Sequence, residues 1–357
     1  VMASNPSSRA VFVQSCVDFL KEHKFDGLDV DWEYPGRAAV ADADRVPGNK
    51  ADKENFSALI RELSAALKPL GYLLAAAVSA GRPTIDDAYN VKELSQLFDF
   101  INLMTYDFNG GWDSRTAHNA PLYPWANANE QDTQFTVSYA VDYWLGLGVD
   151  ANKLVMGLPL YGRSFKLVNP SEHGLQAPAE GKGGDEGPYT RQVGILGYLE
   201  ICDNLKTGQW TVYRDATQKI PYAVKGNQWI GYDDRTSLSE KVAFLKSRGL
   251  GGVCIWSIDT DDFAGHCGDG RFPLLTQVNN DLGSSYQPPN PDPTQGPGPG
   301  PDPGQFECKT AGSFVDPNDP TIYYQCLALG NGSFQKVQRQ CGTGTVFDET
   351  IGVCTHA

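Results

Sequence analysis

The chain has 357 residues, of which 41% are hydrophobic, and its formal net charge is −14 at pH 7. This length and composition exclude a disordered tail and allow a hydrophobic core larger than that of one small domain. The acidic balance argues against nucleic acid or an anionic membrane surface as a partner. No apolar run approaches the roughly 18 residues of a membrane span. Residues 1–9 lack the pattern of a signal peptide, and we expect the N-terminus to be truncated.

Short apolar runs alternate with amphipathic stretches along the first 284 residues. Strands are expected at 25–33, 72–79, 100–107, 153–161 and 252–258. Helices are expected at 9–23, 52–67, 91–97, 133–147 and 237–246. Strand and helix alternation with almost continuously apolar strands indicates parallel strands that are buried on both faces. The predicted fold class is therefore α/β.

Residues 162–231 break this alternation, because they are rich in glycine, aromatic residues and short polar runs. They are expected to form a subdomain inserted between the fourth and fifth predicted strands. A disulfide between Cys202 and Cys267 would close a loop across its end, worth about 4 kcal/mol of loop-closure entropy. Cys16 and Cys254 lie in apolar elements and are expected to be buried free thiols.

Residues 285–305 form a segment rich in proline and glycine that cannot build a core, and they are expected to be a linker. The linker would separate a large part, 1–284, from a small part, 306–357. Four of the eight cysteines lie in the small part, a clustering typical of disulfides in a secreted module. The protein is therefore expected to be secreted and extracellular. No spacing of histidine and cysteine predicts a metal site, and no cofactor is expected.

The sequence DGLDVDWE at 26–33 places Asp29, Asp31 and Glu33 at alternate positions of a predicted strand. Side chains alternate with period two in a strand, so all three should point to one face. Repulsion and loss of water should raise their pKa values, so that at least one carboxyl holds a proton near neutral pH. Glu33 could then protonate a leaving group while a neighbour stays ionised. A calcium site or a solvated acidic edge is the alternative, although calcium loops place turn glycines between their ligands.

This acidic motif resembles the D-x-x-D-x-D-x-E signature of glycoside hydrolase family 18, the chitinases. Later segments resemble further strands of that family in the same order: FINLMTYD at 100–107, GLPLYGRSF at 157–165 and GGVCIWSID at 251–259. The resemblance covers residues 6–283 and implies a TIM (β/α)8 barrel with an α+β insertion that includes the disulfide between Cys202 and Cys267. The first three barrel strands would be missing, which predicts an open barrel with exposed apolar strand surface.

The resemblance also implies roles for the three acids. Glu33 would be the general acid/base, Asp31 would hydrogen-bond the substrate's acetamido group, and Asp29 would be a buried partner that exchanges a proton with Asp31. In the family's substrate-assisted route, the N-acetyl carbonyl oxygen attacks the anomeric carbon while Glu33 protonates the glycosidic oxygen. Water then opens the oxazolinium ion with retention of configuration.

Other matching positions would bind the sugar. Tyr106 and Asp107 would hold the same acetamido group, and Trp256 would form the floor under the sugar at the point of cleavage. Further positions that match the lining of the cleft are Tyr161, Arg163, Met104, Trp112 and Tyr34.

Residues 306–357 resemble the peritrophin-type, CBM14-like chitin-binding module, with an aromatic pair before its third cysteine and the run GTVFD at 344–348. Two of the six cysteines of that module, which pair with each other in the family, are absent here. The disulfides that the resemblance implies are Cys308–Cys326 and Cys341–Cys354. Candidates for sugar contact, or alternatively for packing, are Tyr323, Tyr324 and Phe347.

Taken together, these features predict a chitinase that cuts internal β-1,4 linkages of chitin, with chitin and chitooligosaccharides as partners and a monomeric state. The incomplete barrel predicts that the chain alone is inactive. One alternative is a catalytically inactive chitin-binding lectin, which in the family has usually lost the acid at the position of Glu33. Others are a chitin-matrix protein and an endo-N-acetylglucosaminidase acting on glycoprotein glycans, against which the chitin-binding tail argues.

Overall fold

The computed structural model describes residues 2–36 and 48–283 and, nearer the C-terminus, 308–310, 312–316, 319–328, 334–341, 345–348 and 353–356. The chain divides into two compact units, Val1–Pro288 and Pro289–Ala357. The expected linker at 285–305 lies outside the described residues. No helix within the described ranges is long and apolar enough to cross a membrane.

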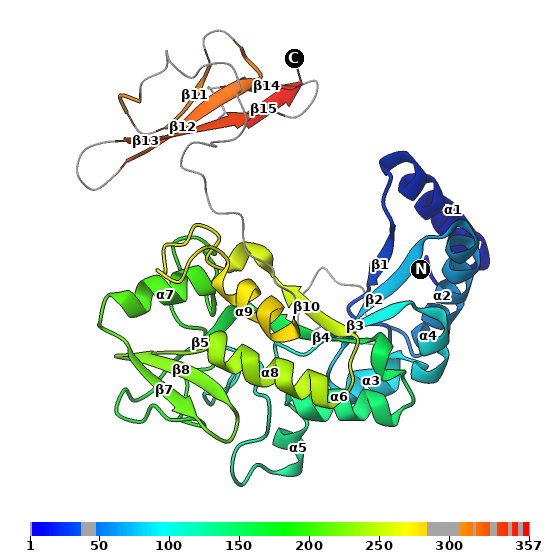
Figure 1. Ribbon diagram of the computed structural model, residues 1–357, viewed down its shortest axis with the longest axis horizontal. Coiled ribbons are helices and arrows are strands. Elements are labelled where there is room, and N and C mark those ends of the chain that lie inside the picture. The colour runs from blue at the N-terminus through cyan, green and yellow to red at the C-terminus, as the bar shows by residue number, and fades with distance from the viewer. Residues whose placement is uncertain are drawn as a thin grey trace. The chain divides into compact units, whose positions relative to one another are not determined.

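The centre of the first unit is a sheet of parallel strands in the order β1-β2-β3-β4-β10 (Figure 1). Its strands are β1 (Gly27–Asp31), β2 (Leu73–Ser79), β3 (Phe100–Met104), β4 (Leu154–Pro159) and β10 (Gly252–Trp256). The predicted parallel α/β arrangement is confirmed, and the described sheet is open, with β1 and β10 at its two edges. Burial on both faces holds for the inner strands β2 and β4, whereas both edge strands are partly exposed.

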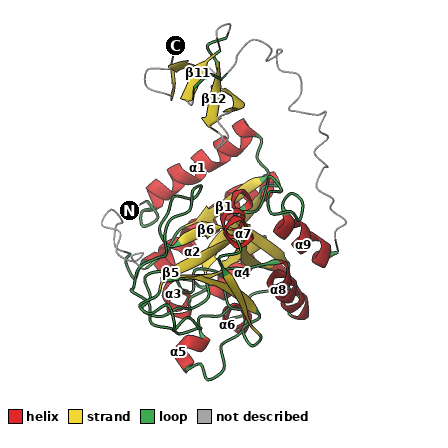
Figure 2. Ribbon diagram, turned by 90° about the vertical axis from the view of Figure 1, so that its left-hand side faces the viewer, coloured by secondary structure: helices red, strands yellow, loops and turns green. Residues whose placement is uncertain are grey.

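Helices follow most of these strands and bury their apolar sides in one hydrophobic core with the sheet. They are α1 (Pro6–His23), α2 (Asp52–Leu67), α3 (Arg82–Ala88), α4 (Val91–Leu97), α6 (Val137–Gly146), α8 (Arg235–Ser247) and α9 (Pro273–Leu282). The short helix α5 (Glu130–Thr133) has no buried residue. Short 3-10 helices cover Lys68–Leu70, Ala151–Lys153 and Ile258–Thr260. Helices α8 and α9 lie side by side (Figures 1 and 2).

Helix ends follow local capping chemistry. Helix α1 begins where the Asn5 side chain accepts the amide of Ser7, with proline at the first helical turn. Helix α6 begins four residues later than predicted, because the Thr136 side chain caps it by accepting the amide of Tyr139.

The insertion is a second sheet, antiparallel throughout, in the order β6-β5-β9-β8-β7. Its elements are β5 (Tyr161–Lys166), β6 (Ile195–Gly197), α7 (Tyr198–Lys206), β7 (Thr211–Asp215), β8 (Ile220–Lys225) and β9 (Gln228–Gly231). A disulfide between Cys202 and Cys267 joins α7 to the loop that precedes α9. An α+β insertion therefore leaves the parallel sheet after β4 and returns to α8.

The second unit is a small β module. It contains the antiparallel strands β11 (Gly312–Val315), β12 (Ile322–Ala328) and β13 (Phe334–Gln340), and the pair β14 (Thr345–Asp348) and β15 (Val353–His356). Disulfides join Cys308 to Cys326 and Cys341 to Cys354.

The aromatic residues of this module differ in exposure. Tyr324 and Phe347 are buried, and the Tyr324 hydroxyl donates to Asp316 Oδ2 at 2.6 Å. The Tyr323 ring is half-buried and stacks on Phe347, with 4.0 Å between ring centroids. Tyr324 and Phe347 therefore pack inside the module and are poor candidates for sugar contact, because so few residues must supply its whole core.

Candidate active site

The three acids of the β1 motif lie together along one wall of a cavity of about 280 Å³. Asp29 and Asp31 are alternate residues of β1, and Glu33 lies two residues beyond its end. Period-two alternation places their side chains on one side of the strand. The cavity lies at the carboxyl ends of the parallel strands, where this class of fold places its ligand sites.

Most of the other predicted site residues line the same cavity: Tyr34, Met104, Tyr106, Asp107, Tyr161 and Trp256. A second hollow of about 390 Å³ shares Asp107, Tyr161 and Trp256 with it and adds Arg163. Trp112 does not reach the first cavity; it lies in a third hollow, together with Arg163. The structure therefore brings together all the predicted residues except Trp112 and Arg163, which extend the site to one side.

Asp29 is exposed, and the prediction of a buried Asp29 is wrong. The reason is the position of β1 at an edge of the described sheet, where no strand covers its outer side. Asn102 Nδ2, on β3, donates a hydrogen bond of 3.0 Å to Asp29 Oδ1.

Both aspartates of β1 have a raised pKa. Although both residues are exposed overall, their carboxyl groups line the cavity, and partial loss of water there is the main cause. For Asp29 the hydrogen bond from Asn102 opposes the rise and the negative charge of Asp31 adds to it. The carboxyl groups of Asp29 and Asp31 therefore retain protons at a higher pH than ordinary aspartates do.

Asp107 is held by two partners from the start of the insertion. The Tyr161 hydroxyl donates to Asp107 Oδ1 at 2.6 Å, and Arg163 binds both carboxylate oxygens, through Nε at 2.7 Å and Nη2 at 2.6 Å. The guanidinium also lies over the rings of Trp112 and Tyr161, at 5.0 and 5.6 Å from their centroids. Ion pairing and ring stacking together fix the position of the Asp107 carboxylate.

Two phenols on the cavity wall remain protonated. Burial is the main cause of the raised pKa of both Tyr34 and Tyr106; Glu33 adds to the shift for Tyr34, and Cys254 and Asp107 add to it for Tyr106. Each hydroxyl can therefore donate a hydrogen bond at neutral pH.

Two tryptophans near the site expose large ring surfaces. Trp256 ends β10, and both it and Trp112 are 57% exposed. A flat ring left open beside a polar cavity offers a stacking surface for a ligand with an apolar face.

Sequence reasoning missed Asn102 and assigned Cys254 wrongly. Asn102 stands in the apolar run FINLM with the same parity as Met104, so the interruption was a usable signal. Cys254 is half-buried and lines the cavity instead of being a buried thiol, because it shares parity with Trp256 on edge strand β10, whereas Cys16 is buried as predicted.

Metal binding at the acidic row receives no support from the described ligand geometry. Within the described ranges, the side chains that lie close enough to share an ion are those of Cys202, Asp262 and Cys267. The disulfide occupies both of those sulfur atoms.

Two family models match the chain: "Glycosyl hydrolases family 18" over residues 1–261 and "Chitin binding Peritrophin-A domain" over residues 308–357. The chain is 42% identical over 282 residues to probable chitinase 10 of Drosophila melanogaster, covering 79% of this chain but only 12% of that protein. It is 37% identical over 374 residues to chitotriosidase-1 of Mus musculus, covering 99% of this chain and 76% of the mouse protein.

Solved structures show the same fold. The Group IV chitinase of Ostrinia furnacalis in complex with allosamidin matches with a TM-score of 0.75 at 42% identity, over 79% of this chain and 74% of that one. Human YKL-39, described as a pseudo-chitinase with retained chitooligosaccharide binding, matches with a TM-score of 0.73 at 43% identity, over 79% and 76%. The chain therefore belongs to glycosyl hydrolase family 18, with the barrel-type fold and insertion of that family and a peritrophin-A chitin-binding domain at its C-terminus.

Proposed function

We propose that the protein is a chitinase that hydrolyses internal β-1,4 linkages between the N-acetylglucosamine units of chitin, by a retaining, substrate-assisted mechanism. The observation that carries this proposal is the row of Asp29, Asp31 and Glu33 on one wall of a cavity that Tyr106 and Trp256 also line. That reaction needs an acid donor, a group that orients an amide and a flat surface under the sugar.

In this mechanism Glu33 protonates the glycosidic oxygen and later activates water. The substrate's own N-acetyl oxygen attacks the anomeric carbon, so no second carboxylate nucleophile is required. Asp31 orients the acetamido group and stabilises the positive charge that develops on it. The raised pKa values of Asp29 and Asp31 suit a pair that exchanges one proton as that charge appears.

Other residues that line the cavity would hold the sugar. Tyr106, a protonated phenol, donates a hydrogen bond to the acetamido oxygen, and Asp107 accepts one from the substrate while Arg163 fixes its carboxylate. The exposed ring of Trp256 lies under the apolar face of the pyranose at the point of cleavage. Tyr34, Met104 and Tyr161 complete the lining of the cavity, and Trp112 lies with Arg163 in the third hollow.

Chitin and chitooligosaccharides are the proposed ligands of both units. The catalytic part would cover residues 1–284, with its insertion at 162–231, and the binding module would cover 306–357, joined by a linker at 285–305. Tethering would raise the local concentration of insoluble substrate at the cleft. Three disulfides favour an oxidising, extracellular location, and we propose that the protein acts as a monomer.

A chitin-binding lectin is the second candidate, because human YKL-39, at 43% identity, is described as a pseudo-chitinase. The role of Glu33 distinguishes the two candidate functions, because a chitinase needs its carboxyl as the acid and a lectin does not.

The decisive experiment compares the full-length protein with its Glu33→Gln variant in binding and hydrolysis of a chitooligosaccharide. Hydrolysis by the unmodified protein, with binding but no turnover in the variant, supports the chitinase. Binding without turnover in both proteins supports the lectin, and substantial turnover in the variant removes Glu33 from its role.

A second substitution, Asp31→Asn, should lower the rate of hydrolysis and displace the pH profile of that rate.

A further inference from the structure

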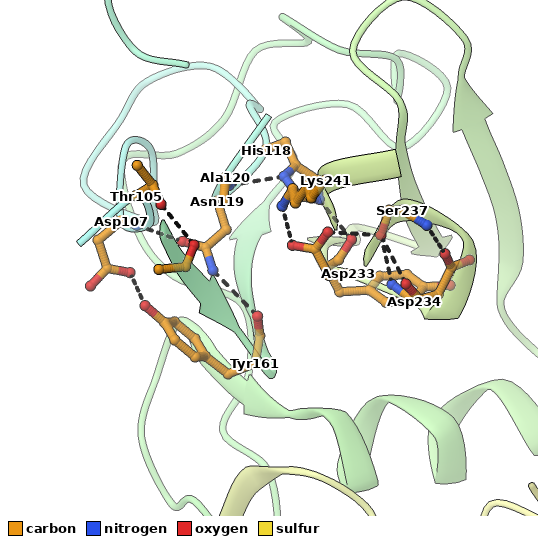
Figure 3. A network of polar contacts seen from close by, with 12 residues as sticks. Thr105, Asp107, His118, Asn119, Ala120, Tyr161, Asp233, Asp234, Ser237 and Lys241 are labelled. Atoms are coloured by element: carbon orange, nitrogen blue, oxygen red, sulfur yellow. Dashed lines mark hydrogen bonds and ion pairs between the residues drawn. The ribbon is translucent and has the colours of Figure 1, made fainter. Parts of the chain in front are cut away.

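Three hydrogen bonds form a closed ring that joins Asp107, Asn119 and Tyr161 (Figure 3). The backbone N–H of Asp107 donates to Asn119 Oδ1 at 2.8 Å. Asn119 Nδ2 donates to the backbone carbonyl of Tyr161 at 3.3 Å, and the Tyr161 hydroxyl donates to Asp107 Oδ1 at 2.6 Å. Asn119 is itself fully buried and lines none of the hollows described above.

We infer that Asn119 is a positioning residue of the cleft, which holds the backbone of Asp107 so that its carboxylate faces Tyr161 and Arg163. The inference rests on the proposed function and deepens it, because it explains how a proposed sugar-binding carboxylate is kept in place by a side chain that does not touch the sugar.

Asp107 needs such support because of its backbone conformation. Its φ angle is +57°, in the left-handed region that residues other than glycine adopt only at an energetic cost. Strained conformations of this kind persist where the surrounding structure fixes them. The Asn119 side chain accepts the N–H of the strained residue itself.

The segment that carries Asn119 is tied to the Asp107 loop by further bonds. The Phe108 N–H donates to the Asn119 carbonyl at 3.0 Å, and Asn109 Nδ2 donates to the His118 carbonyl at 2.9 Å. Residues 107–109 and 118–119 are therefore joined at three successive points, and Asn119 supplies two of them.

His118 anchors this segment from behind. Its Nδ1 accepts the Ala120 N–H at 2.9 Å and its Nε2 lies 2.7 Å from the Tyr232 carbonyl, so the ring is the neutral tautomer with the proton on Nε2. Burial lowers the pKa of His118 to about 4, and the ring stays neutral above that pH.

Beyond His118 lies an ion pair between Asp233 and Lys241, 2.6 Å apart and fully buried, with Ser237 donating to the same carboxylate (Figure 3). A buried ion pair and its hydrogen bond from Ser237 therefore pack behind the segment that carries Asn119.

Two substitutions of Asn119 test the inference. Asn119→Ala removes both side-chain bonds, and we expect binding of tetra-N-acetylchitotetraose to weaken about tenfold at every pH, as for a lost buried hydrogen bond. Asn119→Asp introduces a carboxyl of the same shape. When protonated, that carboxyl can accept from the Asp107 N–H and donate to the Tyr161 carbonyl, as the amide does, whereas the ionised form loses the donor and repels Asp107.

Affinity of the Asn119→Asp variant, divided by that of the unmodified protein at the same pH, should therefore be near one at about pH 4.5 and should fall about tenfold at the pH where the introduced carboxyl ionises, which burial and Asp107 raise above about 3.9. The division removes the titration of Asp29 and Asp31, which both proteins share. Both proteins also share the other titratable and charged side chains that face this site, and the ratio cancels their titration as well. These are Asp107, Tyr106, Tyr161, Arg163, His118, Asp233 and Lys241.

Asn90→Ala is the matched control, because Asn90 Nδ2 also joins two segments, donating to Glu54 and Ser57 at 3.0 Å, and Asn90 is not among the residues that line the cleft. It should lower the melting temperature without altering affinity. If Asn119→Ala behaves in the same way as Asn90→Ala, Asn119 is structural only and the inference fails.

A readout without ligand separates this failure from a failure of the proposed function. When Asp107 is displaced, Arg163 should leave the ring of Trp112. The fluorescence of Trp112 is measured as the signal that is lost on the substitution Trp112→Phe. This signal should differ between the Asn119→Ala variant and the unmodified protein. Absence of binding in the unmodified protein contradicts the proposed function alone. Unchanged Trp112 fluorescence in the Asn119→Ala variant contradicts the positioning role whatever the binding result.

Discussion

Arg163 binds both carboxylate oxygens of Asp107, with Nε 2.7 Å from Oδ1 and Nη2 2.6 Å from Oδ2. The two residues come from different parts of the first unit, since Asp107 follows β3 of the parallel sheet and Arg163 lies on β5 of the insertion. The insertion thus contributes directly to the wall of the proposed active site.

Replacing Arg163 with lysine should weaken binding of chitooligosaccharides about tenfold, because an ammonium group cannot form the two parallel bonds to Asp107 or stack on Trp112 in the same way. Titration calorimetry measures this change.

Arg248→Lys is the control, because Arg248 binds both oxygens of Asp142 at 2.7 and 3.0 Å and lies over the ring of Phe244 outside the cleft. It should leave the affinity unchanged. Equal affinities for the unmodified protein and Arg163→Lys would show that the paired geometry does not matter for binding.

Asp31→Asn should change how stability depends on pH. Partial loss of water in the cavity raises the folded-state pKa of Asp31, so the folded protein holds this proton to a higher pH than the unfolded chain, whose aspartates titrate near about 3.9. The contribution of Asp31 to the free energy of unfolding is therefore lost as pH rises from that value through the raised pKa. Asparagine carries no such proton, and the melting temperature of the variant, relative to the unmodified protein, should rise by about 1–2 °C between pH 3 and pH 7.

Asp26→Asn supplies the reference for that measurement, since Asp26 is exposed and lies just before β1, outside the cavity lining. A pH-independent difference for Asp31→Asn, parallel to that of Asp26→Asn, would contradict the loss of water around Asp31.

Cys254 should react slowly with iodoacetamide and should be protected by ligand. Burial and the nearby charge of Asp29 raise the pKa of its thiol, which lowers the thiolate fraction at pH 7.5. We expect modification about tenfold slower than for free cysteine, and slower still with a chitooligosaccharide in the cavity. Mass spectrometry should assign the label to Cys254, and Cys16→Ala should not alter its rate.

Loss of the disulfide between Cys202 and Cys267 should destabilise the first unit by about 4 kcal/mol, because the bond closes a loop of 65 residues. The double substitution Cys202→Ala and Cys267→Ala should lower the melting transition of that unit in calorimetry. Removing Cys341–Cys354, which spans 13 residues of the second unit, should cost about 3 kcal/mol there and leave the first transition in place. A common shift of both transitions would show that the units do not unfold independently.

Most of what could be predicted about the fold and the site rested on the alternation of side chains along the strands. This alternation placed Asp29, Asp31 and Glu33 on one wall, and the alternation of strands and helices predicted the parallel α/β arrangement. Both signals are local, because a side chain's direction follows from its place in the strand.

Contacts between residues far apart in the sequence could not be predicted from such local signals. The bond between Tyr161 and Asp107 joins residues 54 positions apart, and Asn119 lies in a loop without periodicity. The prediction that Asp29 is buried failed for a related reason. The exposure of Asp29 depends on which strands lie beside β1 and not on the sequence of β1 itself.

Asp107, Tyr161 and Trp256 form a common wall between two neighbouring hollows. A ligand that extends through both would meet the same three side chains from each direction. Substitutions at these positions, whether made by an engineer or by natural variation, would alter the preference for both halves of the ligand at once. Independent adjustment of one half must use residues that belong to a single hollow, such as Met104 on one side or Thr190 on the other.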